Sequence, residues 1–189
     1  GSITGSAGNH LSLSSTSTGS FGTVKSTGGT FIGAGRKLKI DSNSIISLSN
    51  NDNGYDSTLF GKSAGNSLAS DAYYNSSFGN LALQDTSTGD RNTALGSQAL
   101  YRNVTGGNNT AVGAESMLGV NSNSHASNTA VGAYSLKAIT TATGNTAIGY
   151  SAGDSITTSG YNALVGYEVG QSLAGGSGQN VAIGYQPLY

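Results

Sequence analysis

The chain has 189 residues, of which 35% are hydrophobic and 9% charged, with 30 Gly, one Pro, no Cys and no Trp. A single Pro beside so many Gly excludes a collagen-like triple helix, which needs Gly at every third position and abundant Pro. The net charge of -1 and the eight dispersed Lys and Arg argue against nucleic-acid binding, and no apolar run approaches the roughly 20 residues that span a bilayer. We therefore expect no nucleic-acid partner and no direct membrane insertion.

The first third of the chain differs from the rest. Polar and apolar residues alternate over residues 36–41 and 46–49, which predicts two half-buried strands. Asn53-Gly54 is a turn signal, and residues 29–33 resemble a degenerate copy of the repeat that follows. We interpret residues 1–55 as a β connector or shaft segment that precedes a repeat region over residues 56–189.

A five-residue phrase, Asn-Thr-Ala-apolar-Gly, recurs in eight copies through the repeat region. The closing Gly residues are Gly61, Gly79, Gly96, Gly113, Gly132, Gly149, Gly166 and Gly184, so successive copies are 17 to 19 residues apart. A period this regular is typical of stacked structural units with variable loops. The phrase therefore predicts eight rungs, with a Gly corner in each because Gly has no Cβ to obstruct a bend.

The residue before each Gly is apolar and mostly β-branched, which favours a strand. We predict that this column forms the structural core of the repeat. Its members are Phe60, Phe78, Leu95, Val112, Val131, Ile148, Val165 and Ile183.

A second column lies four residues after each Gly. Its members are Leu83, Leu100, Met117, Leu136 and Leu188, with Gly65, Gly153 and Gly170 in the other rungs. This column predicts a second strand, and Leu100, Met117 and Leu136 are candidates for an interchain face. We therefore expect an all-β fold, a parallel β-solenoid or β-roll with rungs of ~17 residues. Its core is so thin that packing against further copies would stabilise it.

Residues 92–136 contain Asn-Thr-Ala-Leu-Gly-Ser-Gln-Ala-Leu-Tyr and Asn-Thr-Ala-Val-Gly-Ala-Tyr-Ser-Leu. This run resembles the repeats of bacteriophage tail-fibre proteins and related bacterial surface fibres. It is also similar to the head of trimeric autotransporter adhesins, where Ala-Ile-Gly repeats build a left-handed parallel β-roll. The resemblance covers about residues 56–189 and implies a side-by-side homotrimer and an extracellular location, on a cell-surface fibre or a virion tail fibre.

Candidates for catalysis or metal binding are few. The two His residues, His10 and His125, lie in Ser- and Asn-rich segments and are expected to be solvated. Residues 175–180 and 51–56 only approximate calcium-binding loops, because the key carboxylates are missing. A glycosidase pair would have to come from acids of which no two share a ladder position in neighbouring rungs: Asp85, Asp90, Asp154, Glu115 and Glu168. We therefore expect no enzyme activity, cofactor or metal.

Two polar columns suggest binding surfaces. Tyr150, Tyr167 and Tyr185 follow the corner Gly in consecutive rungs and should stack as a ladder, either on a ligand or along an interchain seam. A Thr column is interrupted by Ser76, Ala163 and Val181. It suggests an ice-binding face, although its parity with the predicted core favours an inward position. Its Thr residues are Thr58, Thr93, Thr110, Thr129 and Thr146.

These observations lead to a functional expectation. We expect a structural fibre or adhesin domain that attaches to a cell-surface glycan or protein receptor through a trimeric β-roll. The candidate ligand-binding residues are Tyr150, Tyr167 and Tyr185, with Asn121, Asn123 and His125 in the longest loop, and a second candidate loop spans residues 175–179. The alternatives are a passive spacer without ligand, an ice-binding solenoid and a glycan-cleaving tailspike.

Overall fold

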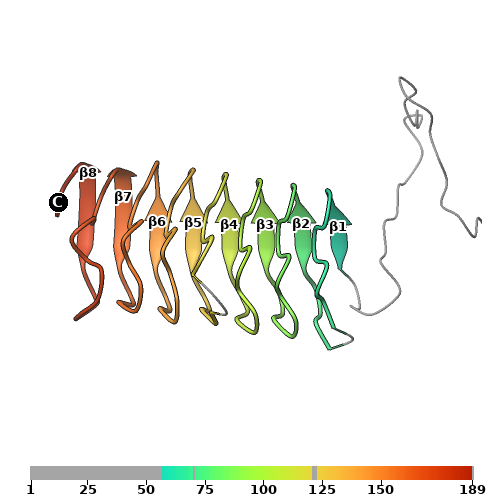
Figure 1. The fold of residues 1–189 in the computed structure, drawn as a ribbon. Coiled ribbons are helices and arrows are strands. Elements are labelled where there is room, and N and C mark those ends of the chain that lie inside the picture. The colour runs from blue at the N-terminus through green and yellow to red at the C-terminus, as the bar shows by residue number, and fades with distance from the viewer. Residues whose placement is uncertain (1–56, 70, 121–122, 189) are drawn as a thin grey trace, which may run out of the picture. The chain divides into compact units, whose positions relative to one another are not determined.

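The computed structural model describes residues 57–69, 71–120 and 123–188, which lie within one compact unit, Ser47–Tyr189. The predicted connector, residues 1–55, lies outside the described residues. Eight strands form a single parallel sheet in sequence order, so each rung adds one strand beside the last (Figure 1). The strands are β1 Thr58–Phe60, β2 Ser76–Phe78, β3 Thr93–Leu95, β4 Thr110–Val112, β5 Thr129–Val131, β6 Thr146–Ile148, β7 Ala163–Tyr167 and β8 Val181–Tyr185.

The register of the sheet follows the repeated phrase. Thr93 pairs with Thr110, and Leu95 pairs with Val112, so equivalent residues of neighbouring rungs lie in ladders. The same register holds across every strand pair from β1 to β8. The prediction of an all-β parallel solenoid with ~17-residue rungs is confirmed, and the described residues contain no helix.

Each rung contains one strand, and the predicted second strand is wrong. The segment after the corner Gly turns through two residues with positive φ, such as Gln98 at 57° and Leu100 at 53°. This left-handed conformation is incompatible with a pleated strand. The turns nevertheless bond to the next rung, because the backbone N–H of Leu100 donates to the carbonyl of Ser116 at 3.0 Å. Hydrogen bonds between rungs therefore continue on the side of the coil opposite the sheet.

The core differs from the predicted one, because the two apolar columns exchange roles. Side chains of a strand alternate between its faces, and the residue that points inward is the second one of each strand, such as Ala94 or Ala147. The inward Ala residues pack against the column four residues after Gly, where Leu83, Leu100, Met117 and Leu136 are all fully buried. Leu100, Met117 and Leu136 are therefore core residues of the single chain and not an interchain face.

The residues predicted to be the core lie on the outer face of the sheet instead. They are correctly placed in one ladder, but all are exposed or half-buried in the chain: Phe60, Phe78, Leu95, Val112, Val131, Ile148, Val165 and Ile183. Sequence reasoning assigned the larger apolar side chain to the interior. The narrow coil places the small Ala there because the opposite wall already supplies Leu and Met.

The Asn that opens each phrase forms a ladder inside the coil. The Oδ1 of Asn145 accepts hydrogen bonds from the backbone N–H of Asn162 at 2.9 Å and from its Nδ2 at 2.8 Å. The Nδ2 of Asn145 donates to the Ser159 carbonyl at 3.0 Å. Buried amides need such partners, and the repetition of this pattern fixes each rung over the next. The buried members are Asn75, Asn92, Asn109, Asn128, Asn145 and Asn162.

The corner Gly ends each strand where two rungs approach closely. Gly149 has φ 135°, and a Cβ at this position would collide with the carbonyl oxygen of Gly166 in the next rung. Both the conformation and the contact therefore require Gly. All eight corner Gly residues share a φ between 130° and 147°.

Candidate interaction surface

The outer face of the sheet carries an exposed apolar column along all eight strands. It consists of the residue before each corner Gly and is called the outer apolar column below. Leu95 is 49% exposed and Ile148 is 41% exposed, although parallel pairing places each directly beside its neighbours. A continuous apolar surface of this kind is typical of an interaction site in a soluble protein.

The Thr column lies on the same outer face, two residues before the outer apolar column. Thr93 and Thr146 are exposed, and Thr110 and Thr129 are half-buried. The expected inward position of these Thr residues is therefore wrong, whereas their shared parity with the outer apolar column is correct. The face thus presents a regular row of hydroxyl groups beside a regular row of apolar side chains.

The three Tyr residues stack as their spacing predicts. The rings of Tyr150 and Tyr167 have centroids 5.3 Å apart with an interplanar angle of 13°. The rings of Tyr167 and Tyr185 are also 5.3 Å apart, at 8°. Tyr134 meets the end of this ladder edge-on, with centroids 5.6 Å apart. The Tyr ladder therefore extends the outer face beyond the corner Gly over the last three rungs.

A carboxylate lies beside the ladder. Hydrogen bonding by Glu168 raises the pKa of Tyr167 above its ordinary value, and the negative charge of the same group acts in the same direction. A raised pKa keeps the phenol protonated throughout the neutral range, because the ordinary value is already 10.0. Tyr167 is therefore uncharged at neutral pH.

The longest loop does not place its candidate residues on the surface. His125 is fully buried and Asn123 is 4% exposed, so neither meets a ligand in solution, and Asn121 lies outside the described residues. The expected solvation of His125 is wrong, and His10 lies in the part of the chain that is not described. Burial lowers the pKa of His125 to about 3, and neither ring nitrogen has a hydrogen-bond partner. This ring is a neutral core residue.

Three of the five candidate carboxylates, Glu115, Asp90 and Glu168, are engaged in local contacts. Glu115 forms an ion pair with Lys137 at 2.8 Å, and Asp90 accepts a hydrogen bond from the Tyr73 backbone at 2.7 Å. Glu168 accepts a hydrogen bond from Gln186 at 2.7 Å. Over the described ranges, His, Asp and Glu side chains form no group of three that could hold a metal ion.

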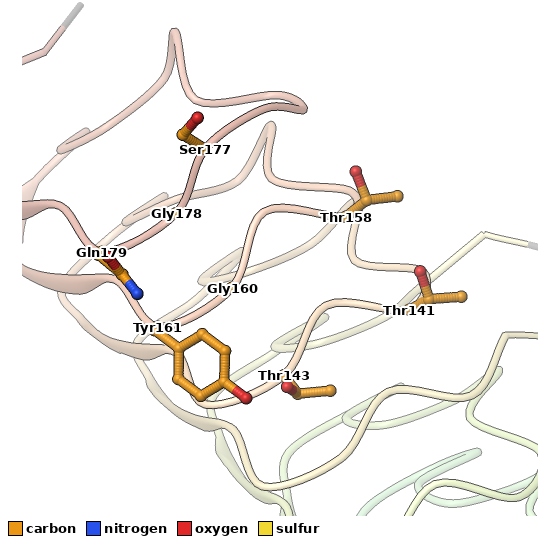
Figure 2. A pocket seen from close by; sticks show the side chains of 8 residues that line it. All are labelled: Thr141, Thr143, Thr158, Gly160, Tyr161, Ser177, Gly178 and Gln179. Atoms are coloured by element: carbon orange, nitrogen blue, oxygen red, sulfur yellow. The ribbon is translucent and has the colours of Figure 1, made fainter.

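A groove on the turn side of the last three rungs includes Ser177, Gly178 and Gln179 of the second candidate loop, residues 175–179, whereas its other lining residues were not predicted from the sequence. It has a volume of about 420 Å³ and is lined by Thr141, Thr143, Thr158, Gly160, Tyr161, Ser177, Gly178 and Gln179 (Figure 2). Tyr161 precedes the ladder Asn of its rung and is 67% exposed. A large aromatic among Gly, Ser and Thr was the available signal in the sequence. Only the fold shows that residues 141–143, 158–161 and 177–179 meet.

Comparisons with protein-family models, curated proteins and solved structures find no match for this chain. No helix in the described ranges is long and apolar enough to cross a membrane. The candidate sites of the described residues are therefore the outer face of the sheet and the turn-side groove.

Proposed function

We propose that this chain is a structural fibre or adhesin domain, which assembles as a side-by-side homotrimer and attaches to a cell-surface glycan or receptor. The observation that carries the proposal is the outer apolar column. A chain with 9% charged residues and a small core exposes Leu95, Val131 and Ile148 in one uninterrupted row. Packing such a row against equivalent rows buries apolar surface at roughly 25 cal/mol per Å².

Several features support a parallel, side-by-side arrangement. The column is straight because each rung repeats the last, and two copies of a repeating ladder match along their whole length. The Thr column flanks the outer apolar column and supplies side chains that donate and accept hydrogen bonds at the edge of such an interface. Attachment then gains from avidity, since copies joined in one fibre present equivalent sites together.

Two alternative roles of the Tyr ladder are compatible with this proposal, and one experiment distinguishes them. At the edge of the outer face the ladder either seals the seam between copies or contacts the receptor. Replacing Tyr150, Tyr167 and Tyr185 together by Ala distinguishes them. Loss of assembly assigns the ladder to the seam, whereas loss of attachment with intact assembly assigns it to the receptor.

The decisive experiment is a mass measurement in solution by sedimentation equilibrium. We expect three times the chain mass of 18.8 kDa at micromolar concentration. A stable monomer would overturn the proposed assembly. A trimer that binds neither host cells nor a glycan array would reduce the function to that of a passive spacer.

One alternative function has a specific observation in its favour. The outward Thr column beside an apolar column gives a flat, regular array of hydroxyl and methyl groups, the chemistry suited to ordering water at an ice surface. An ice-binding solenoid needs this face free, whereas the proposed trimer covers it. Thermal hysteresis shown by a monomer, and lost in Thr110→Tyr and Thr129→Tyr variants, would favour ice binding over assembly.

A further inference from the structure

We propose that the turn-side groove around Tyr161 is a binding site for a neutral saccharide. This inference rests on the proposed attachment function and names the ligand class and the residues that contact it. The groove volume of about 420 Å³ falls within the range of roughly 300 to 1,000 Å³ typical of small-molecule sites. The groove lies among the turns, separate from the outer apolar column.

Tyr161 supplies an aromatic platform. The residue is 67% exposed, and its backbone N–H donates to the Thr143 carbonyl at 2.9 Å. The ring lies against Gly144, because a Cβ at that position would be 2.7 Å from Tyr161 Cδ1. Gly144 therefore lets the ring lie close against the neighbouring rung. A ring held in this way loses little entropy when the apolar face of a sugar packs against it.

The polar groups around the ring are available to a ligand. Within the described residues, the hydroxyl groups of Thr141, Thr143, Thr158 and Ser177 make no hydrogen bond, and neither does the side-chain amide of Gln179. This contrasts with Thr157, whose hydroxyl donates to the Ala174 carbonyl at 2.5 Å. Hydroxyl and amide groups donate and accept hydrogen bonds, as sugar hydroxyls do. In Figure 2, Thr143 and Gln179 lie nearest to the Tyr161 ring, and Thr141, Thr158 and Ser177 lie farther along the same three turns.

The charge of the groove determines the class of saccharide. None of the eight lining residues carries a carboxylate, ammonium, guanidinium or imidazole group. A sialic acid or sulfate would lose hydration here without gaining a cationic partner. A neutral hexose or N-acetylhexosamine has no such cost and matches both the aromatic face and the hydroxyl groups.

The test uses the full chain on an array of neutral hexose and N-acetylhexosamine oligosaccharides, with sialylated and sulfated oligosaccharides beside them. We expect binding to neutral members. The variant Tyr161→Asn should raise the half-saturating concentration at least tenfold, equivalent to about 1.4 kcal/mol. Asn suits this position because Tyr161 has φ 59° and Asn108 occupies the equivalent place with the same φ.

The matched control is Tyr74→Asn. Tyr74 has the same φ of 59° and is 54% exposed, but it precedes Asn75 in an early rung and carries Arg91 over its ring, 5.6 Å from the centroid. This variant should bind like the unmodified chain. Equal losses in both variants, full binding by Tyr161→Asn, or binding confined to charged oligosaccharides would each overturn the assignment.

Sedimentation of the same samples separates this inference from the proposed assembly. A monomer whose neutral-sugar binding depends on Tyr161 would retain the saccharide site and reject the trimer. A trimer that attaches to cells but binds no neutral member of the array would reject the saccharide site and retain the fibre.

Discussion

The side chain of Leu164 occupies the space that a side chain at Gly170 would need. A Cβ on Gly170 would lie 3.0 Å from Leu164 Cδ1, and Leu164 is fully buried. The third rung reverses this arrangement, with Ala94 at the centre of its strand and a buried Leu100 four residues after the corner Gly. The core is thus filled in two ways: in one rung the large side chain comes from the strand, and in the other it comes from the turn on the opposite side of the coil.

This exchange predicts the outcome of a double-mutant cycle. Leu164→Ala should lower the unfolding free energy by about 2 to 5 kcal/mol, because it leaves a cavity. Gly170→Leu alone should also destabilise, since its side chain collides with Leu164. The double variant converts this rung to the pattern of the third, where Leu100 adopts φ 53°, and should recover most of the loss. Urea denaturation of the four proteins measures the coupling, and strictly additive losses would contradict the packing argument.

The Asn ladder predicts a position-dependent loss of stability. Asn145→Ala removes the acceptor for both the backbone and the side chain of Asn162 and the donor to Ser159. Each buried group left unpaired costs about 1 to 3 kcal/mol, so we expect a total loss of at least about 2 kcal/mol.

The matched control at the end of the ladder is Asn180→Ala. Asn180 is only half-buried and donates to Asn162 at 2.8 Å. Its replacement should cost less than half as much as Asn145→Ala. Equal effects in thermal denaturation would mean that the ladder contributes only through local turns.

The repeat was sufficient to predict the class of fold. Eight copies of one phrase, spaced 17 to 19 residues apart, specify stacked rungs, and the pairing of Leu95 with Val112 follows directly. Because successive side chains of a strand point to opposite faces, Thr93 and Leu95 are also expected to share one face. It does not say which face is inside, because that depends on what the opposite wall of the coil contributes.

The wall of the coil opposite the sheet, formed by the column four residues after each corner Gly, could not be predicted from the sequence because of its backbone conformation. Leu100 and Met117 have φ of 53° and 48°, a region that residues with a Cβ rarely enter. Their spacing suggested a strand, whereas tight turns place them in the core. The Tyr ladder was predictable because its members share one ladder position. Of the groove at Tyr161, only the loop over residues 175–179 was predicted as a candidate site, because the groove is built by three turns that are separated in sequence.

The buried His125 predicts acid sensitivity of the fold. Its pKa falls to about 3 in the folded chain from 6.5, so the unfolded chain binds the proton more tightly. The contribution of the neutral His125 ring to the unfolding free energy is fully present above pH 6.5 and is lost as pH falls from 6.5 towards 3. The loss approaches about 1.4 kcal/mol per pH unit.

The variant His125→Leu isolates this effect. It has a similar size and no nitrogen to leave unpaired, so we expect stability at pH 7 at least equal to that of the unmodified chain. Between pH 6.5 and 5, where most carboxylates stay ionised, its unfolding free energy should be nearly flat. Urea denaturation at each pH measures the unfolding free energy of both proteins. If this free energy changes with pH by the same amount in both, a group other than His125 causes the acid sensitivity.

The outer apolar column predicts that one charge disrupts assembly and leaves the chain folded. Ile148 is 41% exposed, so Ile148→Glu should change the stability of the isolated chain by no more than about 0.5 to 1 kcal/mol. In the proposed trimer the carboxylates would be buried together without cations, which is costly. We expect sedimentation to show a folded monomer, whereas Thr88→Glu, on an exposed turn, should leave the trimer intact. An Ile148→Glu trimer would show that copies meet through another surface.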